Sequence, residues 1–398
     1  MRIGMIMDTP FPPDMRVENE AGALLANGHE IYLFHIDYEE RISSEVYEGV
    51  KITRHKAGKL LYKLSALAYT FPFFRWQLNG PVKDFIRKTN IDVLHIHDMV
   101  IAEAVFNANE SFSLPVVMDL HENRPEIMKL YKHTNKWPGN WLINLDLWQE
   151  KQKILMQHAD HVIFVTEEAR QAAARIDDIP KEKTTVLPNT VSLDRYNVDA
   201  KNPAIEKLTE GKFTLLYVGD TSIRRGTLNA LKAAEILQKK IPELQLILVG
   251  DSSQDHLLHT FVKENQLSNS VHFEGWQEPG VLPAYINASD LCLSPLLRNP
   301  HHDTTYANKL FQYMAGGRAV VVSDCPAQAK IVKDEGCGLI HRADDVEDLA
   351  DKIMVLYEHR AKRLKMGKRG AEAVRERWNW NITGTQLLKV YDEIGKKL

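Results

Sequence analysis

Residues 289–324 read SDLCLSPLLRNPHHDTTYANKLFQYMAGGRAVVVSD, and the order of apolar and polar residues in this stretch decides the fold. The apolar run at 291–296 predicts a buried strand, and the polar residues 298–303 predict a loop at its carboxyl end. A helical pattern follows and stops at the glycine pair 316–317, after which 319–322 predicts the next strand. The stretch therefore predicts a strand–helix–strand unit of a parallel sheet.

The start of the predicted helix is a candidate anion site. Tyr306, Leu310 and Met314 recur four residues apart, and Thr304 or Thr305 is placed to cap the helix. Unpaired N–H groups and the helix dipole attract phosphate at such a position, and open α/β sheets bind ligands at the carboxyl ends of their strands. The alternative is an ordinary strand–helix–strand unit with a polar surface loop.

The same alternation of strands and helices runs through both halves of the chain. A polar stretch at 188–212 separates the halves and is interpreted as a linker. We therefore expect two doubly wound parallel-sheet domains, at 1–195 and 205–380, facing each other across a ligand-binding cleft, and a final helix at 381–398 that packs on either domain. The predicted strands are 3–7, 30–35, 93–96, 116–120 and 162–165 in the first domain, and 214–218, 244–249, 270–273, 291–293 and 319–322 in the second.

Composition excludes several classes of protein. With 398 residues, 44% hydrophobic and 26% charged, the chain is typical of a globular protein of two or three domains. A net charge of −3 gives no reason to expect nucleic-acid binding. The three cysteines lack metal-ligand spacing and favour reduced core residues, and neither a signal peptide nor a spanning helix is predicted. We expect a cytoplasmic protein.

The second domain opens with a further candidate phosphate site. Its first strand ends at Gly219 and is followed by Arg224 and Arg225, and a second strand ends at Gly250. Glycine lets the backbone approach a ligand closely, and the arginine fork matches phosphate oxygens. Two adjacent arginines alone are more simply solvated surface residues, but two strands that end in Val-Gly-Asp favour a shared ligand-binding edge.

The chain as a whole resembles the retaining nucleotide-sugar glycosyltransferases of family 4, which have the GT-B fold of two facing Rossmann-like domains. The resemblance covers nearly the whole chain. It rests on motifs in the family's order: RVENEAGALLANGHEI, DVLHIHD, VVMDLHENRPE, ADHVIFVTEEAR, VLPNTV, YVGDTSIRRG, LILVGD, VHFEGW and the opening stretch through NKLFQYMAGGRAVVVSD.

The resemblance implies that two basic residues after the first strand of the second domain hold the donor diphosphate. The matching positions are Asp220 and Arg225, so one of them is acidic, and Arg224, Arg298 or Lys309 would compensate. The family's pair of glutamates, near the donor sugar and the ribose, corresponds here to Thr304 and Gln312. The remaining residues assigned to the donor side are Gly219, Gly250, Thr305, Asn308 and Leu310.

The first domain is expected to face the transferring sugar and the acceptor. His97 and Asp98 end one predicted strand, and His121 and Glu122 end the next. The resemblance implies that a histidine here, His97 or His121, reaches the transferring sugar. Either histidine is equally well explained as a structural residue at the end of a strand, where its ring hydrogen-bonds backbone carbonyl groups. The first loop adds Asp14 and Arg16 on the acceptor or phosphate side, where Arg16 serves equally well in a surface salt bridge.

The function implied is transfer of a sugar from a nucleotide sugar to a glycan, lipid-linked or small-molecule acceptor, as in bacterial polysaccharide or glycoconjugate synthesis. Arg225 and Lys309, with His97 or His121, are the residues assigned to catalysis. No cofactor or metal is expected, since adjacent His301, His302 and Asp303 lack the spacing of a metal site. A sugar-nucleotide epimerase and a non-catalytic relative that binds nucleotide sugar or a partner transferase stay open, as does the oligomeric state.

Residues 59–88 mix lysines and arginines with seven aromatic residues. Aromatic and basic residues together suit a membrane interface, and the resemblance implies that lipid-linked acceptors are common. A helix that covers a sheet is also apolar on one face. Core packing is therefore the preferred interpretation, with peripheral membrane contact as the alternative.

Overall fold

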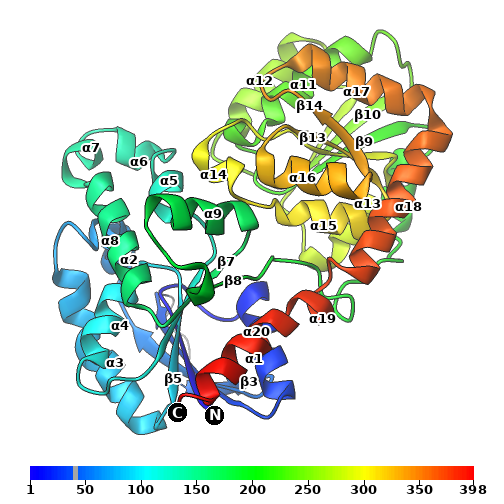
Figure 1. Cartoon of the computed structure of the whole chain (residues 1–398). Coiled ribbons are helices and arrows are strands. Elements are labelled where there is room, and N and C mark those ends of the chain that lie inside the picture. The colour runs from blue at the N-terminus through cyan, green and yellow to red at the C-terminus, as the bar shows by residue number, and fades with distance from the viewer. Residues whose placement is uncertain (39–43) are drawn as a thin grey trace. The chain divides into compact units, whose positions relative to one another are not determined.

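The computed structural model describes residues 1–38 and 44–398, and contacts within the chain divide it into two compact units. The first unit comprises Met1–Pro188 and Gly384–Leu398, and the second comprises Asn189–Thr383. Each unit holds one sheet with helices packed against it (Figure 1). The two doubly wound α/β sheets predicted from the sequence are confirmed. Among the helices described, none combines the length and the apolar character needed to cross a bilayer.

The first unit has an eight-stranded sheet in the order β3-β4-β2-β1-β5-β6-β7-β8. Among the described strands of this sheet, β3 and β4 pair antiparallel and the other pairs are parallel. The order reverses between β1 and β5, so a ligand-binding edge is expected where these two strands end. The strands are β1 Arg2–Met7, β2 Glu30–Asp37, β3 Ser44–Tyr47, β4 Val50–Lys56, β5 Val93–His97, β6 Val116–Leu120, β7 His161–Phe164 and β8 Thr184–Val186.

The second unit has a six-stranded, fully parallel sheet in the order β11-β10-β9-β12-β13-β14. The order reverses between β9 and β12, which is the classical switch point of a dinucleotide-binding sheet. Alternate residues of β9 and β10 pack into two separate apolar clusters, so both faces of this sheet are covered. Its strands are β9 Phe213–Val218, β10 Leu244–Val249, β11 Val271–Gly275, β12 Leu291–Ser294, β13 Ala319–Ser323 and β14 Gly338–His341.

The helices connect these strands and cover the sheets. In the first unit they are α1 Met15–Ala26, α2 Lys59–Leu64, η1 Ser65–Leu67, α3 Phe73–Thr89, α4 Ala102–Asn109, α5 Arg124–Met128, α6 Lys132–Asn135, α7 Gly139–Leu142, α8 Leu145–His158, α9 Glu167–Ile176, η2 Lys181–Lys183 and α20 Thr385–Gly395. In the second they are α10 Pro203–Thr209, η3 Ile223–Arg225, α11 Thr227–Leu237, α12 Asp255–Glu264, η4 Pro279–Val281, α13 Leu282–Ala288, α14 Pro300–Asp303, α15 Asn308–Ala315, α16 Pro326–Glu335, α17 Val346–Glu358, α18 Arg360–Glu376 and α19 Trp380–Thr383.

The end of the chain departs from the single helix expected at 381–398. The structure has α19 and α20, which meet at Gly384, and α20 belongs to the first unit. The buried hydroxyl of Tyr391 in α20 lies 2.7 Å from Nδ1 of His95 in β5. This contact joins the last helix to the centre of the first sheet.

Candidate active site

Two glycines bring the ends of β9 and β10 together in the second unit. Gly219 has φ +111° and Gly250 has φ +131°, a region that side chains disfavour. A Cβ atom on Gly250 would lie 2.1 Å from the carbonyl oxygen of Gly219, so only glycine fits. The two strand ends therefore form one edge with open backbone, as the two Val-Gly-Asp motifs indicated.

Asp220, the acidic residue at a position expected to be basic, is neutralised by its neighbours. Its carboxylate accepts from the Ser222 amide at 2.9 Å and from Arg224 Nη2 at 2.7 Å, and it lies 3.5 Å from Arg225 Nε. Burial alone would raise the pKa of Asp220, but the Ser222 hydrogen bonds and the two arginines outweigh it and lower the pKa. Both arginine side chains are 22% exposed, so they are positioned yet accessible.

Gly226 fixes where these arginines lie. It has φ +79°, and a Cβ atom there would lie 1.6 Å from the carbonyl oxygen of Pro295, the residue after β12. The loop after β9 is thereby pressed against the loop after β12. The arginines consequently lie at the switch point of the sheet.

Lys309, in the first turn of α15, reaches the same edge. Its ammonium nitrogen is buried, has no hydrogen-bond partner among the described residues, and lies 3.5 Å from the ring centre of Tyr217. Burial, and then Arg225, holds the pKa of Lys309 well below its usual value. A buried amine without a partner is costly, which makes this group a candidate ligand for an incoming anion.

The loop between β12 and α15 differs from the capped helix start predicted from the sequence. A separate turn, α14, occupies Pro300–Asp303, and the residue that precedes α15 is Ala307, which supplies no side-chain cap. Thr304 and Thr305 turn backward instead, because their hydroxyls donate to the carbonyls of Pro300 and His301 at 2.9 and 2.7 Å. The capping prediction for these threonines is wrong.

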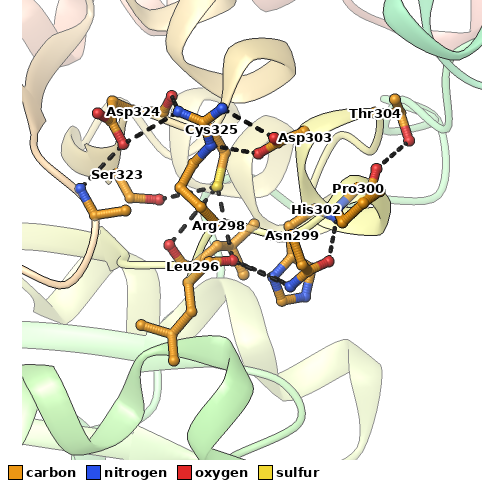
Figure 2. A network of polar contacts seen from close by, with 12 residues as sticks. Leu296, Arg298, Asn299, Pro300, His302, Asp303, Thr304, Ser323, Asp324 and Cys325 are labelled. Atoms are coloured by element: carbon orange, nitrogen blue, oxygen red, sulfur yellow. Dashed lines mark hydrogen bonds and ion pairs between the residues drawn. The ribbon is translucent and has the colours of Figure 1, made fainter. Parts of the chain in front are cut away.

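Figure 2 shows how the rest of this loop is held. The Arg298 guanidinium donates to both carboxylate oxygens of Asp303, at 2.6 and 2.9 Å, and lies 3.9 Å from Asp324. His302 Nδ1 lies 2.7 Å from the Leu297 carbonyl. Arg298 and Asp303 thus satisfy each other's charges at the surface, and His302 is tied to the loop backbone.

The two loop histidines are neutral neighbours of the arginines. His302 Nε2 lies 3.4 Å from Arg224 Nη1, so with Nδ1 donating to Leu297 it accepts from the arginine. Burial lowers the pKa of His301 to about 3, and lowers that of His302 to about 4. Neither histidine adds positive charge at neutral pH.

The other residues assigned to the donor side lie on α15. Asn308 is exposed and Gln312 is half-buried, so both are accessible at the helix surface. Leu310 is fully buried in the apolar cluster beneath the sheet, and its amide donates to the Ala307 carbonyl at 2.8 Å. The side chain of Leu310 therefore supports the helix and does not face solvent.

In the first unit, Arg16 lies at the centre of a buried ionic network. Its guanidinium donates to both carboxylate oxygens of Asp119, at 2.8 and 2.6 Å, and to the Leu187 carbonyl at 3.0 Å. Glu20 Oε1 lies 3.0 Å from Arg16 Nε. Arg16 is only 3% exposed, so it is neither the surface salt bridge nor the open ligand considered from the sequence. Asp14 caps α1 by accepting from the amides of Arg16 and Val17.

His121 joins this network at the end of β6. Its Nε2 lies 2.9 Å from Asp119 Oδ2 and 3.2 Å from His97 Nδ1, and its Nδ1 lies 3.5 Å from Asp98. Burial alone would lower the pKa of His121, but Asp98 and Asp119 raise it to about 10. Burial lowers the pKa of His97, which is 2% exposed, whereas the His121 side chain is 21% exposed. Of the two candidate histidines, His121 is cationic and accessible.

Strain accompanies this arrangement. Asp98 has φ +60°, which is uncommon for a residue other than glycine. Its amide donates to the Asp119 carbonyl at 2.8 Å, and its carboxylate accepts from the His121 amide at 3.0 Å. Asp98 therefore connects the ends of β5 and β6.

The comparisons with known proteins agree with this architecture. Residues 15–195 match the model described as Glycosyltransferase Family 4, and residues 198–373 match Glycosyl transferases group 1. Together these two matches span both units. The chain belongs to the family-4 glycosyltransferases of the GT-B fold.

Individual relatives of this glycosyltransferase are distant but cover its full length. It is 23% identical to a phosphatidyl-myo-inositol mannosyltransferase of Mycolicibacterium smegmatis, over 99% of this chain and 94% of that protein. The structure of a sucrose-phosphate synthase from Thermosynechococcus elongatus superposes with a TM-score of 0.81 at 20% identity, covering 100% of both chains. That of Anabaena HepE in complex with UDP gives 0.73 at 17% identity, covering 99% and 100%.

Sequence reasoning missed three buried members of this glycosyltransferase's first-unit network: Glu20, His95 and Asp119. Burial and then Asp119 raise the pKa of Glu20 well above its usual value. The pKa of Asp119 stays well below its usual value because Arg16 and His121 outweigh the effect of burial. An acidic residue inside the apolar run VVMDL was the available signal, since a buried carboxylate requires a partner.

One cluster among the residues that the structure describes has the residue types and the geometry of a metal site. Glu20, His95, His97 and Asp119 offer ligand atoms within 4.8 Å of one another. The Arg16 guanidinium already supplies the cation between the two carboxylates. In the second unit, Asp303, which was considered as a metal ligand, pairs with Arg298, and the adjacent His302 contacts the loop backbone.

Glu122, assigned to the acceptor side, pairs with Arg124 at 2.9 Å in the first unit.

Proposed function

We propose that this glycosyltransferase moves a sugar from a nucleoside-diphosphate donor to an acceptor hydroxyl with retention at the anomeric carbon. One observation carries the proposal: Arg224, Arg225 and the buried amine of Lys309, which no described residue hydrogen-bonds, meet at the switch point of the second sheet. Three basic groups beside open glycine backbone suit a diphosphate. The complex of HepE with UDP supports a nucleotide at such a fold.

Bond cleavage places negative charge on the leaving diphosphate, so catalysis depends on cations that are already in position. Arg224 and Arg225 would exchange Asp220 for the diphosphate oxygens. Lys309 would gain a proton as the anion approaches, because a nearby negative charge favours the ammonium form. These side chains stabilise the leaving group without a metal ion, and we expect EDTA to leave the rate unchanged.

Retention is proposed to need no protein nucleophile. The acceptor oxygen attacks the face of the sugar from which the diphosphate departs, its proton passes to the departing phosphate oxygen, and the glycosidic bond forms as the carbon–phosphate oxygen bond breaks. Gln312 would accept from a ribose hydroxyl, and the Thr304 oxygen, which donates to Pro300, retains lone pairs that accept from the sugar.

In the first unit, His121 is proposed to contact the transferring sugar. It is the more exposed of the two candidate histidines and is oriented by Asp98 and Asp119. Cationic His121 would donate a hydrogen bond to a sugar hydroxyl, and His97 would hold His121 in position. The acceptor is proposed to be a glycan, a lipid-linked molecule or a small molecule.

The test is incubation of the protein with UDP-, GDP-, ADP- and dTDP-sugars. Thermal stabilisation measures binding, release of nucleoside diphosphate measures transfer or hydrolysis, and proton NMR of the product measures its anomeric configuration. We expect one donor class to stabilise the protein and to yield product with the donor's anomeric configuration. No stabilisation by any donor would refute the proposal, and an inverted product would refute retention.

Two alternatives are separated by the same experiment. Conversion of the free nucleotide sugar to its epimer, without release of nucleoside diphosphate, would indicate an epimerase. Binding without release under any acceptor would indicate a non-catalytic relative. Asp220, Thr304 and Gln312, which replace the family's basic and acidic residues, are the positions that favour the latter.

A further inference from the structure

The last helix brings one polar group into the centre of the first unit. α20 packs beside α1 and β8 (Figure 1), and its residues Leu387, Val390 and Ile394 are at most 5% exposed. Tyr391 on the same helix is fully buried, and its hydroxyl lies 2.7 Å from His95 Nδ1. Phenylalanine would pack equally well without a polar group to satisfy, so core packing does not account for this hydroxyl.

Tyr391 is the donor in its contact with His95. Burial, and then Glu20, raises the pKa of Tyr391 well above its usual value, so the hydroxyl keeps its proton. Burial, and then His97, holds the pKa of His95 well below its usual value, so this ring is neutral and has a single N–H. His95 Nε2 faces carboxyl oxygens of Glu20 and Asp119, at 3.4 and 4.0 Å, which favours the proton on Nε2. His95 Nδ1 therefore accepts from Tyr391.

A stack of three rings carries this contact along β5. The centre of the His95 ring lies 6.1 Å from that of Tyr391 and 4.5 Å from that of His97, and the planes are inclined by 20° and 19°. His95 and His97 are neighbours on one face of the strand, because alternate residues point to the same side. The plane of the His97 ring is thus set by the His95 ring, which Tyr391 holds.

The stack ends on the histidine that is proposed to contact the sugar. His97 Nδ1 lies 3.2 Å from His121 Nε2. Cationic His121 has an N–H on both ring nitrogens, so His97 Nδ1 is the acceptor in this contact. A change in the plane of the His97 ring would lengthen the contact and leave His121 with Asp98 and Asp119 alone. The row therefore connects a hydroxyl of the last helix to an accessible imidazolium.

We propose that Tyr391 is a positioning residue for His121, acting through His95 and His97. The hydroxyl fixes the His95 ring, the stacked His95 ring fixes His97, and His97 Nδ1 holds His121 in the orientation that meets the sugar. The proposal rests on the proposed function, because it takes His121 as the sugar contact. The last helix then contributes to catalysis as well as to the core of the first unit.

The kinetic test is Tyr391→Phe in the full-length protein, with a nucleotide sugar that supports release of nucleoside diphosphate. Phenylalanine keeps the stacked ring and removes only the hydroxyl. We expect kcat to fall about three- to tenfold, the effect of one neutral hydrogen bond. The KM for the donor should stay within about twofold, because the diphosphate is proposed to bind in the second unit.

Tyr357→Phe is the matched control. Tyr357 donates a hydrogen bond of the same length, 2.7 Å, to Glu243 in the second unit, far along the chain from this row. The control should leave kcat unchanged. An equal fall in kcat in both variants would overturn the proposal, since the loss would then follow from any missing tyrosine hydroxyl.

A double-mutant cycle separates positioning from a general effect on the fold. In the His121→Gln background, Tyr391→Phe should change kcat by less than about twofold, because no imidazole is left to position. If Tyr391→Phe lowers kcat by the same factor in both backgrounds, the proposal is overturned, because Tyr391 would then act without His121.

A measurement that needs no turnover completes the test. Ring signals of 13C-labelled histidine at pH 7, assigned with His97→Gln and His121→Gln, report the surroundings of each ring. We expect the signals of His97 and His121 to shift in Tyr391→Phe and to stay in place in Tyr357→Phe. An unmoved His121 signal, with an unchanged melting temperature, would overturn the proposal. Shifted signals in a protein that turns over no donor would support the positioning of His121 and refute the proposed function, so the two failures are distinct.

Discussion

Replacing Lys309 by methionine separates binding from stability more clearly than any other change in the proposed donor site. Methionine keeps the length and the apolar stem of lysine but lacks the amine, which is buried above the Tyr217 ring and has no hydrogen-bond partner in the described part of the chain. Removal of an unsatisfied buried polar group relieves about 1–3 kcal/mol. We therefore expect the ligand-free Lys309→Met protein to be as stable as the wild type or more stable, in urea unfolding.

Nucleotide binding should change in the opposite direction. A hydrogen bond from a charged group contributes about 1.5–3 kcal/mol, so loss of Lys309 should weaken UDP, or whichever diphosphate binds, by about 10- to 150-fold. Because the pKa of Lys309 is held well below its usual value by burial and then by Arg225, the wild type should take up a proton as the anion binds. Titration calorimetry over a series of pH values, in two buffers of different ionisation enthalpy, measures that uptake.

Lys232→Met is the matched control, because Lys232 is an exposed lysine on α11 of the same unit. It should leave stability, affinity and proton uptake unchanged. Equal affinity and equal proton uptake in Lys309→Met and the wild type would refute the reasoning. A clear loss of stability in Lys309→Met would also refute it, because the amine would then be a charged, stabilising group in the free protein.

Three further changes test the geometry of the two sheet edges. Asp220→Asn removes the carboxylate that pairs with Arg225 and its neighbouring arginine. Calorimetry should show several-fold tighter diphosphate binding at low salt, and no gain at high salt. Weaker binding would contradict this. Gly226→Ala, with φ +79° and a clash at Pro295, should lose more than about 2 kcal/mol in urea unfolding, whereas an unchanged midpoint would exclude the close approach. His121 has a pKa raised from 6.5 to about 10, so its contribution to stability is full below pH 6.5 and is lost as the pH rises towards 10; His121→Gln should flatten that decline in thermal melts.

The sequence predicted what depends on local pattern. The strand at 116–120 was placed to the residue because its run of apolar side chains is bounded by Pro115 and His121. Strands β3, β4, β8 and β14 were not predicted. β3, β8 and β14 lie at sheet edges and have only three or four residues, which is too short for a clear pattern. The seven residues of β4 do alternate, so that strand could have been predicted. The open glycine edge at Gly219 and Gly250 could likewise be predicted, because a strand that ends in glycine is a local signal.

The partners of charged residues could not be predicted in this way. Arg16 and Asp119 are 103 residues apart in the sequence. The spacing of apolar residues predicts which face of a helix or strand a side chain occupies, but not which residue it contacts there. The expectation that Thr304 caps a helix was wrong because a separate turn begins at Pro300. The Thr304 hydroxyl donates a hydrogen bond to the Pro300 carbonyl of that turn. Which of two neighbouring turns the hydroxyl bonds to depends on how the whole loop packs, and this cannot be predicted from the threonine alone.

Charge balance distinguishes the two edges and supports the assignment of the diphosphate to the second. In the first unit, Arg16 and His121 are offset by Asp119 and Asp98, while burial and then Asp119 raise the pKa of Glu20 well above its usual value. That edge is internally satisfied and suits orientation of neutral hydroxyls.

In the second unit, Arg224 and Arg225 share the single carboxylate of Asp220, and Lys309 can add a further charge by taking up a proton. In the free protein the two guanidinium groups are occupied by Asp220. A diphosphate that displaces this carboxylate would gain both guanidinium groups, and Asp220 would take them back when the product leaves, which favours release.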